Sequence, residues 1–499
     1  MLFRKTFAAL LVIGALTGAH AATPGHEVIP LYDGPGGATC DYFNVGGRVK
    51  WHHKRGDWKD INGVVQGPAP FASAIIESID KSRVIEWDLT ALARRWLKTP
   101  EANQGVALTA VPGRAGGSVY FHSREADDPQ LRPRLVLEYG DNSRQTVAPE
   151  ADVHLDCSTV QPLGKDKLLL AGRDTITAMR FVLNASAGDD LRRATLQLTT
   201  NAKQYGNVII GVYELDPPAK ELPGEPQLGI AKDYPLDRGI TKDPDVLMGT
   251  SFESALWFSD WSYVSPTLTF GTLASDDALG FKPLDGKALR VKIPHGGNVG
   301  LDLGYDFKGK TGVEPEEIYF RYYLRFADDF VSYVDGGKLP GVSGTYGRAG
   351  WGGRKWDGRA GWSMRGGFAR TPEQGNPLHD YVTISSYAYH AGADDFWGDE
   401  WVWDLGLRGL LRRNRWYCVE QYFRVNSVGA NDGEIKGWVD GELALHRTGV
   451  RVRDIPDIRI ERVWMNVYHG GTSPAASDMH LYIDNVVIAR RYIGPMRRD

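Results

Sequence analysis

Apolar residues in this chain recur mostly at every second position, in short runs that end at Gly, Pro, Asn or Asp. The run at residues 318–326 shows this most clearly, because Ile318 and Phe320 fall on one side of an extended chain while Arg321 and Arg325 fall on the other. A period of two is the signature of a β-strand with one face in a core. Helical periodicity is scarce, so we predict an all-β fold.

The length of 499 residues is enough for two or three domains with their own cores. A Pro-rich stretch at 217–226, followed by charged turns up to Asp245, predicts a boundary. We therefore divide the chain into a smaller β-sandwich region at 22–245 and a larger β domain at 246–499. One short helix is expected at 89–98, with Thr90 as its cap.

The first residues resemble a secretory signal peptide. Arg4 and Lys5 precede a short apolar stretch at 7–16, and Ala19-His20-Ala21 forms a small-x-small cleavage site. We predict a signal peptide at 1–21 and a secreted or periplasmic protein. No later apolar run approaches about 18 residues, so no membrane span is expected.

Three cysteines follow, Cys40, Cys157 and Cys418. In an oxidising compartment an odd count leaves one thiol unpaired. Cys418 lies in a strand-like run and is expected to be a buried thiol, whereas Cys40 and Cys157 are predicted to pair. Their spacing fits no zinc pattern.

Two further runs in the second half, 361–365 and 382–389, alternate like 318–326. Each pairs an apolar face with a polar one, and a curved sheet would gather the polar side chains into a groove. The side chains on the polar faces of these two runs are Ser363, Arg365, Thr383, Ser385, Tyr387 and Tyr389.

Charge and aromatic residues in the same region indicate an anionic, sugar-like ligand. The chain as a whole has a net charge of −4, yet residues 338–370 contain seven basic residues and one acidic residue. Tryptophans also gather here, and aromatic rings can stack on sugars. They are Trp351, Trp356, Trp362, Trp397, Trp401 and Trp403. The pI of about 6.3 and the predicted export disfavour nucleic acid as a partner.

The first half resembles a DNRLRE-type domain, a β-sandwich family related to carbohydrate-binding modules. Segments similar to the second half of such a domain occur at 87–90, 121–125 and 132–139, and segments similar to its first half at 179–183, 194–198 and 212–213. The halves are therefore in swapped order. Our hypothesis is one circularly permuted sandwich whose two halves are linked by a Cys40–Cys157 disulfide. The alternative is two separate small sandwiches.

The second half resembles polysaccharide lyase family fourteen over about 249–490. The similar segments are 336–341 (GGKLPG), 362–365 (WSMR), 387–389 (YAY), 416–421 (WYCVEQ), 438–441 (WVDG), 468–471 (YHGG) and 483–485 (IDN). The resemblance implies a concanavalin-like β-jelly roll and an alginate or glucuronan lyase. The long stretch between Arg365 and Tyr387 and the Gly- and Arg-rich loop at 342–361 depart from the family pattern.

The resemblance implies five catalytic residues, Lys338, Ser363, Arg365, Tyr387 and Tyr389. A polyuronate lyase removes the proton on C5 and protonates the O4 leaving group, so it needs cations near the uronate carboxylate. We expect Tyr389 or Tyr387 as base and acid, with a pKa lowered by Lys338 and Arg365, and Ser363 as a hydrogen-bond donor. The choice of base between the tyrosines and Lys338 stays open.

Four further residues, Arg321, Trp351, Gln421 and His469, are predicted to bind substrate. The partner is expected to be an acidic polysaccharide, and no cofactor or metal is predicted. Two other functions compete with the lyase. A glycoside hydrolase needs two suitably spaced carboxylates, and the nearest approach is Glu400 to Asp404. A non-catalytic glycan-binding protein would share the groove but has no need of paired tyrosines.

Overall fold

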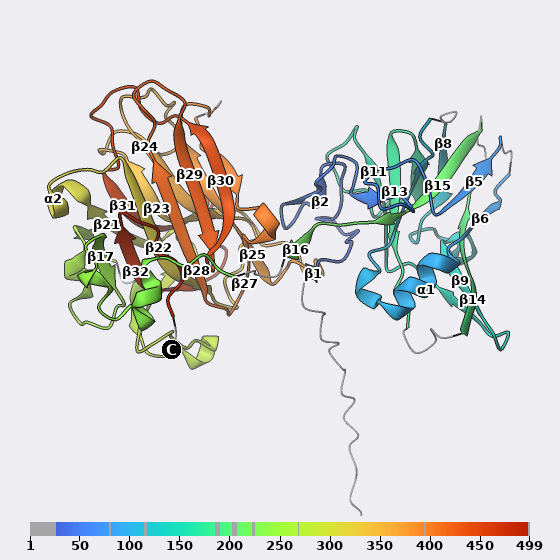
Figure 1. Ribbon diagram of the computed structural model, residues 1–499, viewed down its shortest axis with the longest axis horizontal. Coiled ribbons are helices and arrows are strands. Elements are labelled where there is room, and N and C mark those ends of the chain that lie inside the picture. The colour runs from blue at the N-terminus through green and yellow to red at the C-terminus, as the bar shows by residue number, and fades with distance from the viewer. Residues whose placement is uncertain are drawn as a thin grey trace, which may run out of the picture.

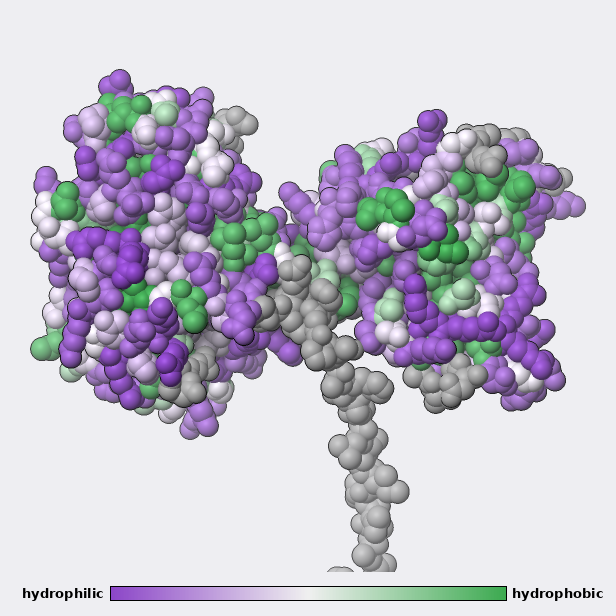
Figure 2. Space-filling view, in the orientation of Figure 1, coloured by the Kyte–Doolittle hydropathy of each residue, from purple (hydrophilic) through white to green (hydrophobic). Residues whose placement is uncertain are grey.

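The computed structural model describes residues 26–78, 81–113, 117–184, 190–201, 207–221, 225–267, 269–393 and 396–497. The predicted signal peptide at 1–21 lies outside the described residues. The chain forms two β-rich lobes (Figure 1), and their surfaces are mainly hydrophilic in the view of Figure 2. None of the described helices is long and apolar enough to cross a bilayer.

In the described part of the first lobe, two sheets face each other. One has the order β10-β9-β14-β6 and the other β11-β13-β7-β15-β4, with β5 also paired to β15. Their bounds are β4 (Trp58–Lys59), β5 (Ala72–Ile76), β6 (Val84–Asp88), β7 (Val106–Ala110), β9 (Arg134–Tyr139), β10 (Arg144–Val147), β11 (Ala151–Asp156), β13 (Thr175–Arg180), β14 (Leu191–Thr199) and β15 (Val208–Leu215). Three short antiparallel pairs join β1 (His26–Val28) to β16 (Ala219–Glu221), β2 (Tyr42–Asn44) to β3 (Val49–Lys50), and β8 (Ser118–His122) to β12 (Leu168–Gly172).

The two halves of this lobe share one core. Strand β14 lies between β9 and β6, and β15 pairs with both β5 and β7, so late strands insert between early ones. Trp87, Leu135, Leu196 and Val212 belong to the same buried cluster. These contacts favour one sandwich over two separate ones, because neither half has a core of its own.

The helix expected in this lobe is present as α1 (Thr90–Lys98), with Leu92, Trp96 and Leu97 buried. Its capping differs from the expectation. The N-cap position is Leu89, and the Asp88 carboxylate accepts hydrogen bonds from the backbone N–H and the hydroxyl of Thr90, at 2.9 and 2.5 Å. Thr90 is therefore capped rather than capping, and the carboxylate lies near the positive end of the helix dipole.

Cys40 and Cys157 form a disulfide with a Cα–Cα distance of 5.1 Å, and Cys418 is a buried free thiol. The disulfide ties the N-terminal segment to the end of β11. That segment lies between the lobes, where a second apolar cluster includes Phe43 from the first lobe and Leu378 from the second. The lobes are thus joined by a shared core as well as by the chain.

In the described part of the second lobe, two antiparallel sheets of eight strands each pack face to face. The first contains β17 (Val246–Thr250), β19 (Phe270–Leu273), β20 (Ala288–Ile293), β22 (Glu317–Phe326), β28 (Tyr417–Arg424), β29 (Gly433–Val439), β30 (Glu442–Val450) and β32 (Met479–Ala489). The second contains β18 (Tyr263–Val264), β21 (Val299–Asp306), β23 (Gly337–Gly344), β24 (Trp362–Phe368), β25 (Tyr381–Tyr389), β26 (Asp399–Val402), β27 (Leu410–Arg412) and β31 (Arg462–His469). A short helix, α2 (Phe307–Thr311), follows β21. The all-β jelly-roll architecture agrees with the prediction.

Every second side chain of each strand points into the large core between these two sheets. Trp362 and Met364 of β24 and Ile384 and Ala388 of β25 point into it, as their alternation predicts. The polar residues between them therefore lie on the outer face of the β23–β24–β25 sheet, and this face carries the candidate site.

The outer face of the other sheet is covered instead. Ile230 and Ile240, from the segment that follows the first lobe, and Ile493, near the end of the chain, pack on Tyr323 of β22. These contacts associate residues 230–242 with the second lobe, so we infer a structural boundary earlier than the one drawn at 245.

Candidate active site

Strand register brings the predicted catalytic side chains together on one face. Strand β24 pairs with β25 so that Arg365 lies opposite Tyr387 and Ser363 lies opposite Tyr389. On the other side of β24, β23 places Lys338 beside Tyr468 of β31. Cross-strand neighbours on one face are in contact range, so four strands build a single site.

A cleft lies on this face, with one part of about 350 Å³. Its lining includes Lys338, Arg365, Tyr387, Tyr389, Trp351, Trp397, Trp464, Asn466 and Tyr468. A neighbouring cavity of about 270 Å³ shares Lys338, Tyr387 and Trp397 with it, so the two form one continuous cleft.

Lys338 lies where both cavities meet. Its Nζ is 3.5 Å from the centroid of the Tyr387 ring. Burial lowers the pKa of Lys338 to about 8, and the nearby charge of Arg365 acts in the same direction. A lysine in this state exchanges a proton close to neutral pH, as a general base must.

Arg365 forms a buried cationic site. Its Nη1 donates to Oδ1 of Asn466 at 3.0 Å, and its guanidinium lies 4.6 Å from the Trp464 ring. Arg365 makes no ion pair with any carboxylate among the described residues, and its buried Nε has no hydrogen-bond partner there. Burial lowers the pKa of Arg365, as it does for Lys338, because it disfavours the charged form. A buried guanidinium with unused donors is suited to receive a carboxylate from a ligand.

The two tyrosines stay protonated at neutral pH. The Tyr387 and Tyr389 rings are 5.5 Å apart in an edge-to-face arrangement. Burial raises the pKa of both, and this outweighs the opposing charge of Arg365. The expectation that neighbouring cations lower these pKa values is therefore wrong, and the phenols are better suited to donate a proton than to remove one.

Ser363 lies beneath the cleft rather than in it. It is fully buried, and its hydroxyl donates to the backbone carbonyl of Gly350 at 2.6 Å. Gly350 directly precedes Trp351, which lines the cleft. Ser363 thus fixes the loop that presents Trp351, while the predicted direct hydrogen bond to substrate finds no support in this geometry.

Arg321, predicted to bind substrate, lies on the sheet that does not carry the cleft. It is fully buried on β22, where its Nη2 pairs with Asp237 at 2.8 Å and its Nη1 donates to the carbonyl of Asn485 at 2.9 Å. The alternation of β22 correctly separated its two faces. The polar face is covered by residues 230–242, so Arg321 neutralises a buried carboxylate instead of lining a groove.

Gln421 and His469 are also buried away from the cleft. The Gln421 side chain donates to the backbone carbonyl of Met364 at 3.3 Å, between the two sheets. The His469 Nε2 lies 2.6 Å from the Ser332 hydroxyl, and its Nδ1 lies 3.0 Å from the carbonyl of Ser473. Both predictions of substrate contact are wrong, because both side chains are already bonded within the fold.

Of the six clustered tryptophans, Trp351 and Trp397 line the cleft. Trp397 is half exposed and is available for stacking on a sugar. Trp362, Trp401 and Trp403 are buried.

Sequence reasoning missed Trp464, Asn466 and Tyr468 of β31. They alternate with Val463 and Met465, which are buried, so the same period-two argument would have found them. It also missed Arg48, which reaches the cleft from the first lobe. Within the described ranges no cluster of His, Cys, Asp and Glu suitable for a metal is found.

The family model described as Polysaccharide lyase 14 matches residues 284–485, which include every cleft residue named above except Arg48. The second lobe thus carries a polysaccharide lyase domain. No curated protein matches the chain.

Solved structures with a similar fold include three lyases. Alginate lyase Aly36B has 19% identity and a TM-score of 0.38, covering 50% of this chain and 98% of that chain. The alginate lyase from Aplysia kurodai has 16% identity and a TM-score of 0.35, and the match covers 49% of this chain and 98% of that chain. The endo-beta-1,4-glucuronan lyase from Trichoderma reesei has 14% identity and a TM-score of 0.33, and the match covers 49% of this chain and 95% of that chain.

Proposed function

We propose that this protein is an exported polysaccharide lyase that cleaves a uronate-containing polymer, such as alginate or glucuronan, by β-elimination. The observation that carries the proposal is the buried guanidinium of Arg365, which lines the cleft beside Lys338. Arg365 forms no ion pair with a carboxylate among the described residues, and its buried Nε has no hydrogen-bond partner there. Because an uncompensated buried charge is costly, the site is built for an anionic ligand.

The reaction begins with the uronate carboxylate on Arg365. Asn466 holds the guanidinium in place, and the cation stabilises the negative charge that develops when the C5 proton leaves. Neutral Lys338 accepts that proton on Nζ, in keeping with its lowered pKa. The electron pair of the C5–H bond forms the C4=C5 double bond, and the C4–O4 bond breaks.

The leaving oxygen receives its proton from Tyr387. This phenol lines both parts of the cleft and lies against Lys338, and its raised pKa keeps it protonated at neutral pH. Tyr389 is the neighbouring phenol that orients it. Base and acid are thus a lysine and a tyrosine, whose pKa values burial shifts in opposite directions.

A glycoside hydrolase fits the cleft less well. Hydrolysis needs two carboxylates free to act as acid and as base or nucleophile. Glu400 already pairs with Arg48 and accepts from Ser385 at 3.0 Å. Asp335 accepts backbone N–H groups from Gly336 and Gly471.

An ultraviolet assay on polymannuronate, polyguluronate and glucuronan tests the proposal. Elimination creates a C4=C5 double bond that absorbs in the ultraviolet, whereas hydrolysis does not. We expect rising absorbance on at least one polymer, abolished in Lys338→Ala and retained in Lys308→Ala, a matched loss of an exposed lysine on α2. Flat traces with retained binding would instead establish a glycan-binding protein.

A further inference from the structure

A hairpin of the first lobe reaches the catalytic cleft of the second. Strands β2 and β3 are joined by a turn at which Arg48 has a φ of 58°, in the left-handed region that is costly for a residue with a side chain. Such a conformation persists only where surrounding contacts hold it. Within the first lobe the backbone N–H of Arg48 donates to the carbonyl of Val45 at 3.1 Å, and the second lobe adds further contacts.

These contacts are buried hydrogen bonds between the lobes. The side-chain amides of Asn44 and Asn376 donate to each other at 2.9 and 3.1 Å, and the hydroxyl of Thr383 donates to the carbonyl of Gly47 at 2.8 Å. Both asparagines are almost completely buried. The turn that carries Arg48 is therefore fixed on β25 and on the loop before it.

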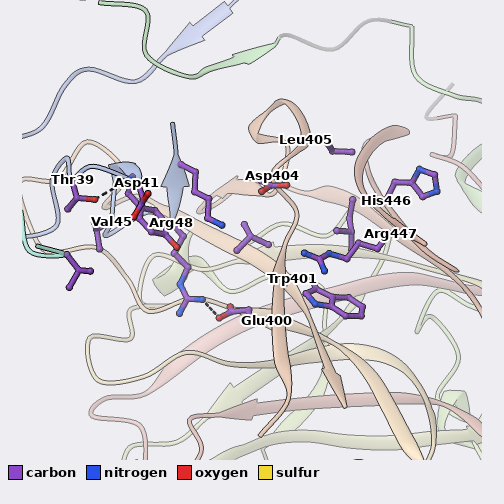
Figure 3. Close-up of a pocket in the computed structure, with 15 residues that line it drawn as sticks. Thr39, Asp41, Val45, Arg48, Glu400, Trp401, Asp404, Leu405, His446 and Arg447 are labelled. Carbon is purple, nitrogen blue, oxygen red and sulfur yellow. Dashed lines mark hydrogen bonds and ion pairs between the residues drawn. The ribbon is translucent and has the colours of Figure 1, made fainter. Parts of the chain in front are cut away.

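The Arg48 side chain enters the cleft beside the proposed catalytic residues. It lines the same cavity of about 270 Å³ as Lys338 and Tyr387. One guanidinium nitrogen pairs with Glu400 (Figure 3). In the sheet, Glu400 lies directly opposite Tyr387. For the remaining N–H donors of Arg48 the described residues provide no hydrogen-bond partner.

Arg48 is a partly buried cation, and such a group favours a negative ligand. Burial and, to a smaller extent, the charge of Arg370 lower the pKa of Arg48, while Tyr42 and Asp335 oppose them. The Asp335 carboxylate is itself engaged by the backbone N–H groups of Gly336 and Gly471. Arg48 therefore keeps unused donors in a partly cationic part of the cleft.

The cleft continues beyond Arg48 into the space between the lobes. Arg48 and Glu400 also line a pocket of about 580 Å³, whose walls come from the first lobe on one side and from β26 and β30 on the other (Figure 3). Neighbouring cavities thus share lining residues, Lys338 and Tyr387 for the first two and Arg48 and Glu400 for the last two. A polymer that is bound at Arg365 and extends toward the first lobe would pass Arg48.

We propose that Arg48 forms an additional subsite for a uronate carboxylate, so that the substrate cleft is built from both lobes. This inference rests on the proposed function, because it assumes a polyuronate in the cleft. Arginine suits the role, since its planar fork can bind a sugar carboxylate with two parallel hydrogen bonds while it stays paired with Glu400.

The test is the dependence of affinity on chain length. The parent protein carries Lys338→Ala, so that ligands are not consumed, and calorimetry measures the binding of mannuronate, guluronate and glucuronate oligomers from dimer to octamer. We expect affinity to rise with length in the parent, and Arg48→Ala to weaken octamer binding by about tenfold to a hundredfold while affecting the dimer less. Arg48→Lys should restore part of the loss.

Two controls separate the subsite from other effects. Arg144→Ala removes the same charge from an exposed site on β10 and should change no affinity. Because Arg48→Ala also leaves Glu400 unpaired, Arg48→Ala/Glu400→Gln is measured as well. If the second substitution restores full affinity, repulsion by Glu400 was the cause and the subsite is wrong.

The remaining outcomes are equally distinct. Unchanged octamer affinity in Arg48→Ala, or an equal loss at every length, would overturn the subsite and leave Arg48 as a link between the lobes. Length-dependent binding without any ultraviolet-absorbing product from the unmodified enzyme would overturn the lyase function alone. A parent that binds no oligomer would overturn both.

Discussion

The amino group of Lys338 and the ring of Tyr387 are in direct contact, with Nζ 3.5 Å from the ring centroid. The two side chains come from β23 and β25, on either side of β24, where Gly367 pairs with Lys338 and with Ser385, two residues before Tyr387. Because Gly367 has no side chain, the Lys338 side chain can cross β24, so the base and the acid of the proposed reaction can meet on one face of the sheet.

The activity should depend on the protonation of Lys338. Its pKa is lowered to about 8, so the neutral form predominates above that pH. We expect kcat/KM to fall about tenfold per pH unit below pH 8 and to level off above it. Initial rates measured over a pH series check this, and any residual activity of Lys338→Ala should lack the acidic limb. A profile that is flat from pH 6 to 9 would contradict Lys338 as the base.

Tyr387→Phe should reduce kcat by about 10²- to 10⁴-fold with little change in KM, because it removes a proton donor without removing the ring. Tyr389→Phe serves as the matched comparison and should cost less, since Tyr389 only orients its neighbour. Steady-state kinetics on the best polymer measure both. A larger loss of kcat in Tyr389→Phe would indicate that Tyr389 is the proton donor and that Tyr387 orients it.

Ser363→Ala should reduce activity only several-fold, mainly through KM, because it releases the Gly350 carbonyl and loosens the loop that carries Trp351. Arg365→Ala, two residues along the same strand, should reduce kcat by about 10²- to 10³-fold. The comparison depends on circular dichroism spectra that match the wild type. Equal losses of kcat in the two variants would indicate that Ser363 acts at the reacting centre.

Arg321→Met should destabilise the fold without affecting substrate binding. It leaves Asp237 as an unpaired buried carboxylate, which costs about 3–5 kcal/mol of unfolding free energy. Arg321→Met/Asp237→Asn should recover part of this loss. Denaturant unfolding gives the stabilities, and KM measured on the folded protein should stay at the wild-type value. A raised KM would place Arg321 in the binding site after all.

Reduction of the disulfide should lower stability by about 2–5 kcal/mol, because Cys40 and Cys157 close a long loop, with a sequence separation of 117. Thermal unfolding with and without a reductant measures the effect. The Cys40→Ala/Cys157→Ala variant should no longer respond to reductant, whereas Cys418→Ala should respond like the wild type. A reductant effect that survives in the double variant would be inconsistent with this bond.

The part of the site that could be predicted from sequence is the part that depends on strand periodicity. Once 361–365 and 382–389 are taken as strands, Arg365, Tyr387 and Tyr389 must lie on the face opposite Met364 and Ala388, and they do. Periodicity is a local property, and neighbouring strands of an antiparallel sheet preserve it.

What covers a face is not a local property. Strand β22 alternates as clearly as β25, but residues from about eighty positions earlier cover its polar side, so Arg321 is buried. The same holds for the tyrosine pKa values, because cations near Tyr389 were foreseeable while the depth of burial that outweighs them was not. Arg48 depends on contacts between lobes that no spacing within the sequence reveals.

The apolar cluster between the lobes makes the N-terminal lobe an integral part of the fold, unlike an appended binding module. Appended modules move on flexible linkers and can be exchanged between enzymes. Here Phe43 and Leu378 are buried in a common core, and the hairpin beside them forms a wall of the cleft. A truncated second lobe would expose that core to water and lose one wall, so the smallest unit with the complete cleft includes both lobes.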